Sequence, residues 1–519
     1  MSGGTLQILI AMVVYMLAVI GIGLFFAKRA NQSSENYFLG GRTLGPWIAA
    51  MSAEASDMSG WLLMGLPGVA YWCGLADAAW TAIGLAVGTY LNWLLVSKRL
   101  RRYSAVADNA ITIPDFFSNR FHDKKKVLMS ISAVFILVFF TVYAASCFVT
   151  CGKLFSTLFG FSYTSMMIAG AVFVVIYTFL GGFLAESTSD FMQSIIMIIA
   201  LVGVLVVSTI AAGGSAQILE NIKAIPGFFE FFGVATPTVT DGVQQVSNGK
   251  ALFGEAGGYG FLTIISTLAW GLGYFGMPQV LLRFMAIRKV SELKNSRRIA
   301  TTWAVISMTA AVIIGLIGRV LYPDALLTSG QAESVFILVS TKLLPPLIAG
   351  LAMAGIIAAT ISSSDSYLLI ASSAFSKNLF QGVFKKNATD KQVMNVSRIV
   401  LVLTAVLGVI LANDENSVIF KIVSFAWAGF GATFGPIMLF SLFWKRTTLQ
   451  GAIAGMLAGG VSVFVWKLLI RPMGGVFGIY ELLPAFLISC LCIVLVSLVT
   501  EKPSQEIQDE FEKAKTYEY

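Results

Sequence analysis

The sequence has few charged residues and almost no histidine. Only 12% of its 519 residues are Asp, Glu, Lys or Arg, against about 25% in soluble domains, while 57% are hydrophobic. A single histidine, His122, and the lack of any Cys-x-x-Cys pair argue against a hydrolase or metalloenzyme. We expect no enzyme and no organic cofactor. A mean hydropathy of +0.81 predicts a polytopic protein of the lipid bilayer.

Motifs of other membrane-protein classes are missing as well. The chain has no G-x-x-x-x-G-K-[ST] loop, which argues against an ATP-driven pump, and no TVGYG-like channel filter. Its five cysteines lie in or beside apolar runs, and we interpret them as small buried hydrophobic residues. The net charge is +8, but the basic residues are spread among short polar segments. This pattern is typical of membrane topology and not of nucleic-acid binding.

The apolar runs predict an all-α fold with about thirteen membrane-spanning helices. The interval 337–374 is too long for one span, so we expect its helix to extend past the bilayer or to bend. Alternate connecting segments are rich in Lys and Arg, with eight in 97–126 and six in 281–298, which places the N-terminus outside and the C-terminus in the cytoplasm. The predicted spans are 6–27, 45–68, 75–97, 127–155, 162–181, 190–212, 257–280, 299–322, 337–374, 394–412, 417–443, 448–468 and 479–500.

The second span contains acidic and helix-breaking residues. Glu54 and Asp57 lie one turn apart in an otherwise apolar run, and Ser59 and Gly60 follow them. An unwound turn would free backbone carbonyls, which can coordinate a hard cation such as Na⁺. The alternative is a kinked helix whose acids pair with basic residues at its end.

The seventh span is interrupted by three glycines and a proline. Pro278 has no N–H, so the carbonyl of Tyr274 should lose its helical partner. Trp270 and Tyr274 lie one turn apart and could form one aromatic wall. The alternative is an interfacial aromatic belt beside a proline kink.

A third polar segment lies in the ninth span, where Ser362 and Ser366 share a helix face with Ala359. Small residues and hydroxyls are also ordinary packing devices, but Asp365 is harder to explain in that way.

Two further features lie outside these three segments. Glu186 and Asp190 lie at the inner end of a span and could be functional or a solvated cap. A repeat of Gly451, Gly455 and Gly459 predicts a helix-packing seam.

The placement of the two interrupted spans suggests internal symmetry. The breaks lie about 210 residues apart, in the second and seventh spans, so five spans separate their starts. An odd number of spans per repeat inverts the second copy. Paired broken helices in corresponding positions indicate an inverted-repeat secondary transporter with a site in the middle of the membrane.

The interrupted spans belong to longer strings that resemble the sodium/solute symporter family, and within it the carriers of proline. The resemblance extends from about Tyr37 to the end of the last span. The strings are Phe38–Pro46, Ser56–Gly68, Ile113–Phe117, Tyr177–Phe183, Trp270–Gly276 with Pro278, and Ala426–Gly431.

The resemblance implies the five-plus-five inverted-repeat (LeuT-like) fold. An N-terminal extra helix and first inner loop would occupy 1–44, and the transport core 45–443. Within the core, the first repeat would cover about 45–212, an outer loop 213–256 and the second repeat about 257–443. Two C-terminal helices would fill 444–500. We expect a short surface helix or a lid in the outer loop, and a charged, mostly solvated cytoplasmic tail in 501–519.

The resemblance also implies the site residues. Asp57 is similar to a carboxylate important for sodium, and Asp190 resembles one on the inward sodium path, on which we also place Asp365. Arg42 matches a functional arginine at the inner end. Sodium would bind the carbonyls of Ala55, Met58 and Ala359 and the side chains of Ser362 and Ser363, and proline would contact Ser59, Trp61, Tyr143, Trp270, Tyr274 and Pro278.

Three residues depart from the family pattern. Ser363 stands where some proline carriers have Thr, which keeps the hydroxyl. Glu54 and Asp365 stand where some members are uncharged, which leaves the sodium stoichiometry and a role for protons open. The function implied is sodium-coupled uptake of L-proline across the cytoplasmic membrane. The alternatives are a symporter of the same fold for another amino acid or osmolyte, and a solute sensor.

Overall fold

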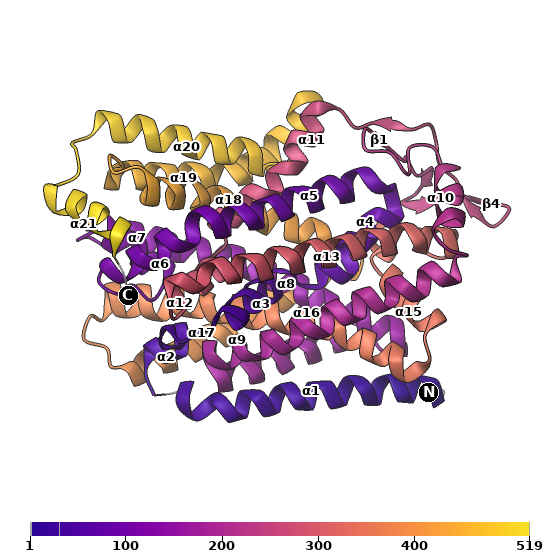
Figure 1. Ribbon diagram of the computed structural model, residues 1–519, viewed down its shortest axis with the longest axis horizontal. Coiled ribbons are helices and arrows are strands. Elements are labelled where there is room, and N and C mark those ends of the chain that lie inside the picture. The colour runs from indigo at the N-terminus through magenta and orange to yellow at the C-terminus, as the bar shows by residue number, and fades with distance from the viewer. Residues whose placement is uncertain (1–2, 31, 518–519) are drawn as a thin grey trace.

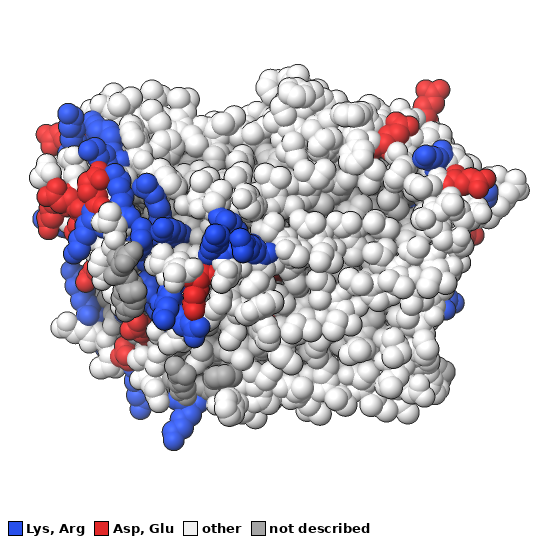
Figure 2. All heavy atoms as spheres, viewed as in Figure 1, with Lys and Arg blue, Asp and Glu red and all other residues white. Residues whose placement is uncertain are grey.

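The protein is a bundle of long helices that lie along the longest axis of the molecule (Figure 1). The computed structural model describes residues 3–30 and 32–517. The two ends of the chain lie toward opposite ends of the bundle. Charged side chains gather at these two ends, with Lys and Arg most abundant at the end that holds the C-terminus, and the wide middle of the visible face is almost free of charge (Figure 2). This distribution is that of a chain crossing a bilayer.

The described residues form twenty-one α-helices and six two-residue strands. The helices are α1 Gly3–Ala30, α2 Ser34–Leu39, α3 Pro46–Asp57, α4 Leu66–Cys73, α5 Leu75–Leu91, α6 Ser97–Val106, α7 Ile113–Arg120, α8 Val127–Phe159, α9 Tyr163–Ala211, α10 Ser215–Lys223, α11 Phe261–Leu268, α12 Pro278–Ala286, α13 Leu293–Leu321, α14 Ser329–Ala332, α15 Val335–Leu343, α16 Pro346–Ser373, α17 Asp390–Leu411, α18 Ile419–Phe443, α19 Leu449–Val465, α20 Leu482–Val499 and α21 Gln505–Thr516. The strands are β1 Gly233–Val234, β2 Val239–Thr240, β3 Val243–Gln244, β4 Val246–Ser247, β5 Lys250–Ala251 and β6 Gly257–Gly258.

The prediction of a multi-spanning helical protein is confirmed. Within the described residues, ten helices are long and apolar enough to cross a membrane, and a pair bent by 44° at Met277 makes eleven. Two shorter apolar helices, Trp61–Cys73 and Tyr163–Phe179, occupy the places of the second half of the second span and of the fifth span. The exact count of thirteen stays a prediction.

The interval 337–374 holds two helices instead of one long or bent span. α15 ends at Leu343, Leu344 is extended, and α16 begins at Pro346. The reason is the Pro345-Pro346 pair, because proline cannot donate to the preceding turn and forces the residue before it out of the helical region. Helical structure then continues beyond α16 through a π-helical segment to Phe384.

Two polar segments are more ordered than the sequence indicates. The outer loop carries α10, as expected, and also three small antiparallel pairs, β1 with β6, β2 with β3 and β4 with β5. The charged tail forms the helix α21, in which two residues are shielded from solvent. Phe511 and Ala514 are buried against α6, and His122 lies 2.9 Å from Glu510.

The glycine repeat in α19 is a packing seam, as predicted. A Cβ on Gly451 or Gly455 would clash with Ser497 or Ile493 of α20, and one on Gly459 with the carbonyl of Ala432 in α18. The seam therefore brings the C-terminal helix pair together and joins it to the core.

Candidate functional site

The second predicted span is broken where the sequence indicates. α3 ends at Asp57, Met58 leaves the helical region (φ −88°, ψ 77°), and a helix resumes only at Trp61. Gly60 lies at the break because a Cβ there would collide with Thr150 of α8. The break exposes carbonyls at the end of α3 and backbone amides without a side-chain cap at the start of the next helix.

The seventh predicted span is broken as well. Its 3₁₀ segment Ala269–Gly276 is followed by extended Met277, and α12 starts at Pro278. The Tyr274 carbonyl, which Pro278 deprives of a helical donor, accepts a hydrogen bond from the Asn92 side chain at 2.9 Å. A buried carbonyl needs such a partner, so Asn92 stabilises the open break.

The hydroxyl-rich segment of α16 packs against the end of α3. The Ser362 hydroxyl lies 2.8 Å from the Ala55 carbonyl and 3.2 Å from the Ala359 carbonyl, and the Ser363 hydroxyl lies 3.2 Å from the Ala55 carbonyl. All four residues are fully buried. The structure thus brings together four of the five residues predicted to ligate sodium through carbonyls and hydroxyls, and the fifth, Met58, begins the adjoining break.

Asp57 connects the two broken helices. Its carboxylate accepts hydrogen bonds from the Tyr274 hydroxyl at 2.7 Å and from the Gln279 side chain at 3.4 Å. Its own carbonyl accepts from the indole of Trp61 at 3.2 Å and the hydroxyl of Tyr143 at 3.4 Å. These contacts place Trp61, Tyr143 and Tyr274, three of the residues predicted for the substrate, around Asp57, whose carbonyl and carboxylate lie between the two breaks.

Trp270 and Tyr274 form an aromatic wall, and its centre is Trp427 of α18. The ring of Trp427 lies 5.0 Å from that of Tyr274 and 6.0 Å from that of Trp270, and its indole N–H donates to the Trp270 carbonyl at 2.8 Å. Gly273 lies directly against the Trp427 ring, where a Cβ would clash. The remaining residues predicted for the substrate lie at the breaks, Ser59 just after Asp57 and Pro278 at the start of α12.

A cavity of about 660 Å³ borders this wall at Trp270, on the side of the bundle that carries the outer loop. Trp270 lines it together with Phe420 and Tyr480, whose rings lie 5.2 Å and 5.1 Å from that of Trp270. Of the residues predicted for the substrate, only Trp270 lines this cavity. The three rings therefore separate the cavity from the two breaks.

Glu333, in the segment between α14 and α15, also lines the cavity and fixes the start of α18. Its carboxylate accepts from the backbone amides of Ile419 and Phe420, both at 2.9 Å. Burial raises the pKa of Glu333, and the Lys153 ammonium at 3.0 Å opposes this shift.

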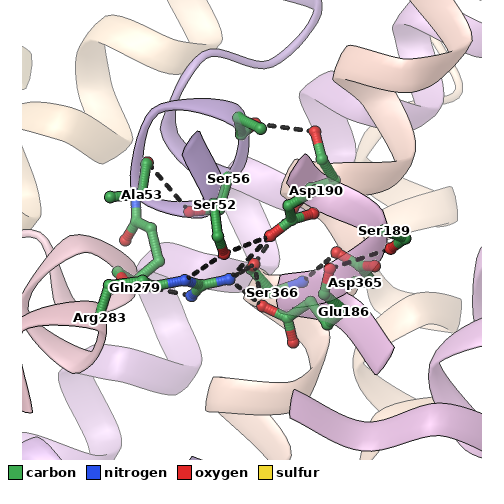
Figure 3. Close-up of polar contacts among 12 residues, drawn as sticks. Ser52, Ala53, Ser56, Glu186, Ser189, Asp190, Gln279, Arg283, Asp365 and Ser366 are labelled. Carbon is green, nitrogen blue, oxygen red and sulfur yellow. Dashed lines mark hydrogen bonds and ion pairs between the residues drawn. The ribbon is translucent and has the colours of Figure 1, made fainter. Parts of the chain in front are cut away.

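A buried arginine holds the carboxylates at the opposite side of the breaks (Figure 3). Arg283 of α12 pairs with Glu186, and with Asp190 at 3.1 Å. Its guanidinium also donates to the hydroxyls of Ser52, at 2.9 Å, and Ser366, at 3.0 Å. One cation therefore ties α12 to α3, α9 and α16.

The interpretation of Glu186 and Asp190 as a solvated cap is wrong, because the two residues are only 2% and 0% exposed. Asp365 is fully buried in the same region, and one of its oxygens accepts the backbone N–H of Ser366 at 2.7 Å. The three carboxylates share one arginine, so this buried cluster carries more potential negative than positive charge. Such a cluster favours a cation.

Arg42 closes the same side of the molecule. It follows two glycines with positive φ, and its guanidinium donates to the Met285 carbonyl at 2.7 Å and the Ala110 carbonyl at 2.8 Å. It also donates to Ser104 and Asn109. These bonds join the segment before α3 to α6 and α12, and Arg42 is only 5% exposed.

The sequence reading missed Arg283, Asn92, Gln279 and Trp427. Arg283 was counted among the basic residues of an inner segment, although the apolar run Val280–Leu282 before it and Phe284–Ile287 after it was a signal of burial. Trp427 lies in one of the motif strings, but no spacing rule connects it to Trp270. Asn92 and Gln279 donate hydrogen bonds to groups at the broken helices, and these roles can be recognised only once the breaks are placed beside them.

The chain is similar to known sodium-coupled carriers. A model of the "Sodium:solute symporter family" matches residues 37–459. The sequence is 41% identical to a sodium/proline symporter of Haemophilus influenzae, over 98% of this chain and 97% of the relative. It is 42% identical to a high-affinity proline transporter of Bacillus subtilis, over 94% of this chain and 97% of the relative. A Na⁺-coupled sialic acid symporter, solved in a substrate-bound outward-open state, matches with a TM-score of 0.75 at 18% identity, over 96% of this chain and 99% of that one, and shows the fold.

Proposed function

Because this chain belongs to the sodium:solute symporter family, we propose that it takes up L-proline together with Na⁺ across the cytoplasmic membrane. It is a transporter and not an enzyme. The observation that carries the proposal is the contact of the Ser362 and Ser363 hydroxyls with the Ala55 carbonyl at the break after α3. Hydroxyl and carbonyl oxygens at a broken helix form the kind of site in which this class of fold binds its coupling ion.

Sodium would be held between α3 and α16. The site would consist of hard oxygen ligands, the carbonyls of Ala55, Met58 and Ala359 and the hydroxyls of Ser362 and Ser363. An ion among them would take the place of the present hydrogen bonds, and each hydroxyl would turn its proton away from the carbonyl. Asp57 adds a negative charge next to this break. The ion would bind α3 to α16 and favour the state in which that contact is made.

Proline would lie between the two breaks. Its carboxylate suits the uncapped backbone amides at the start of a resumed helix, at Trp61 or at the residues after Pro278, because helix N-termini attract anions. Its apolar ring suits the Trp270, Trp427 and Tyr274 wall. Ser59, Tyr143 and Pro278 would complete the pocket.

Alternating access follows from the two sides of the site. The outer side has the 660 Å³ cavity, while the inner side is closed by Arg42 and by the Arg283 network, so we assign this structure to an inner-closed state. Inward release would pass Asp190 and Asp365 after these contacts open. Because binding is linked, sodium must raise proline affinity by the factor by which proline raises sodium affinity.

The excess of Lys and Arg at the end that holds the C-terminus supports a cytoplasmic location for that end and an N-terminus outside. One positive charge that enters with the solute then gains about 2.3 kcal/mol per 100 mV, which is roughly a fifty-fold accumulation before any sodium gradient is added.

Purified protein in liposomes is expected to accumulate labelled proline when Na⁺ is supplied outside, and not when K⁺ replaces it. A panel of unlabelled amino acids and osmolytes, each added in excess, then tests the substrate, with proline expected to compete best. Equal uptake in Na⁺ and K⁺ would contradict sodium coupling. Proline binding without any uptake would favour the sensor alternative, and stronger competition by another solute would reassign the substrate.

Ser362→Ala is expected to raise the Na⁺ concentration for half-maximal uptake at least about tenfold, since one hydroxyl ligand is lost. Ser364→Ala is the matched control. Ser364 is equally buried two residues away, but its hydroxyl donates within its own helix, to the Thr360 carbonyl at 2.5 Å. A similar Na⁺ dependence in both variants would remove Ser362 from the site.

A further inference from the structure

A second cavity, of about 480 Å³, opens at the basic end of the bundle, between α6 and the start of α13. Five basic residues line it, and Trp93 lies among them. Lys and Arg side chains gather over this part of the surface (Figure 2). The five are Lys98 and Arg102 from α6 and Lys289, Lys294 and Arg297 from the turn before α13 and its first turns.

None of the described residues that line this cavity is acidic. Lys98, Lys289 and Lys294 are exposed, and Arg297 lies over the ring of Tyr90 at 5.3 Å. The acid nearest in sequence, Glu292, makes a two-pronged pair with Arg288 at 2.8 to 3.1 Å, so its charge is already neutralised. The described lining of the cavity therefore concentrates positive charge.

The start of α13 adds to this field. This helix has 29 residues and follows directly on the 3₁₀ turn Val290–Glu292; its first turn has no acidic residue, and its N-cap residue, Glu292, is paired with Arg288. Leu293 and Lys294 of its first turn line the cavity. The dipole of α13 favours a phosphate near this end of the helix, here together with the converging cations.

The surface on the lipid side of the cavity is apolar. Leu94 lines the cavity and is 41% exposed. Val87 and Tyr90 on α5 are 52% and 42% exposed, and Val305 and Ile306 on α13 are 46% and 42% exposed. An occupant that needs both a charged pocket and an apolar strip is an amphiphile, and a free phosphate would use only the first.

We propose that this cavity binds the phosphate of an anionic phospholipid whose acyl chains lie along α5 and α13. Basic pockets between helices at the cytoplasmic side suit such head groups. The lipid would hold α6 to the turn after α12, where Arg101 already donates to the Ile287 carbonyl at 2.7 Å and Leu44 exchanges backbone hydrogen bonds with Ala286 and Arg288. It would thus stabilise the inner-closed arrangement.

The competing explanation is that these residues only set membrane topology, as basic residues do near the inner surface. That explanation does not require the basic side chains to converge on one cavity, as these five do. It also predicts that basic residues elsewhere at the same end are equivalent, which provides a matched control.

The test compares three proteins: the wild type, a cavity variant and a control variant. The cavity variant carries Lys98→Gln, Lys289→Gln, Lys294→Gln and Arg297→Gln. The control variant removes the same charge from exposed lysines outside the cavity, with Lys124→Gln, Lys125→Gln, Lys385→Gln and Lys386→Gln. Thermal unfolding in detergent is followed while phosphatidylglycerol, phosphatidylcholine, glycerol phosphate or inorganic phosphate is titrated, and native mass spectrometry counts retained lipids.

Phosphatidylglycerol is expected to stabilise the wild type and the control variant, and the cavity variant should need at least about tenfold more of it, since four attractive charges are lost. Phosphatidylcholine should stabilise all three proteins weakly and equally. Equal losses in both variants would overturn the proposal in favour of general surface attraction. Equal stabilisation by inorganic or glycerol phosphate would show a soluble ligand and overturn the lipid. If the four-residue variant does not fold, Lys98→Gln with Lys294→Gln is compared with Lys124→Gln with Lys125→Gln.

Discussion

Asp57→Asn is expected to lower sodium-dependent proline uptake at least about 100-fold. A carboxylate about 4 Å from a cation contributes roughly 4 kcal/mol at an effective dielectric constant of 20, and each 1.4 kcal/mol is tenfold in affinity. Asn keeps the shape, and its one amide oxygen can still accept from the Tyr274 hydroxyl, while its NH₂ group would face Gln279, whose amide can turn its own oxygen toward it. The loss should therefore come from the missing charge, and the Na⁺ concentration for half-maximal uptake should rise more than the KM for proline.

Two further variants separate charge from burial and from hydrogen bonding. Glu54→Gln neutralises an equally buried carboxyl one turn earlier on α3, for which the described residues provide no hydrogen bond to α12. Its Na⁺ requirement should change less than tenfold. Tyr274→Phe removes only the hydroxyl that donates to Asp57 at 2.7 Å, and it should raise the Na⁺ requirement about tenfold. A loss in Glu54→Gln as large as in Asp57→Asn would contradict a specific role for Asp57.

Arg283→Gln is expected to destabilise the protein by about 3 to 5 kcal/mol and to abolish uptake. Removing one partner of a buried ion pair leaves the other charge uncompensated in a poorly solvated place. Here two partners, Glu186 and Asp190, lose their cation, and α12 loses its contacts with α3, α9 and α16. The measurement is thermal unfolding of the purified protein together with uptake in liposomes.

A compensating change distinguishes lost charge balance from lost packing. Arg283→Gln combined with Glu186→Gln removes one charge of each sign, so the double variant should unfold at a higher temperature than Arg283→Gln alone. Arg283→Lys keeps the charge but loses the planar fork, and it should fall between the wild type and Arg283→Gln. A double variant as unstable as Arg283→Gln would show that the network matters through packing and not through charge.

Both broken helices could be predicted because their causes are local. Pro278 lacks an N–H and Gly60 has no side chain, so each weakens a helix at its own position. The Tyr274 carbonyl was predicted to lose its helical donor, and the structure places the Asn92 side chain there instead. Ser362 was singled out from its polar segment, and Ser363 and the sodium role of both hydroxyls came from the resemblance, but their contact with Ala55 is seen only in three dimensions.

The basic residues show where reading the sequence fails. Arg42 and Arg283 were counted with the charges of inner connecting segments, yet they are 5% and 0% exposed. Arg101 and Arg120 of the 97–126 segment are likewise fully buried. A count of charges reports which side of the membrane a segment lies on, but it cannot tell a solvated arginine from one that closes the protein interior, because the partners come from elsewhere in the chain.

The sequence by itself determined that this chain crosses a bilayer many times and that two of its spans are interrupted, because hydropathy and helix-breaking chemistry act over a few neighbouring residues. Only the tertiary structure decided what those interruptions touch. Arg283 meets Ser52, Glu186 and Ser366, which lie 231, 97 and 83 residues away. Such pairings depend on how helices pack, and side chains that compensate each other's charge inside a membrane need proximity in space and no regular spacing along the chain.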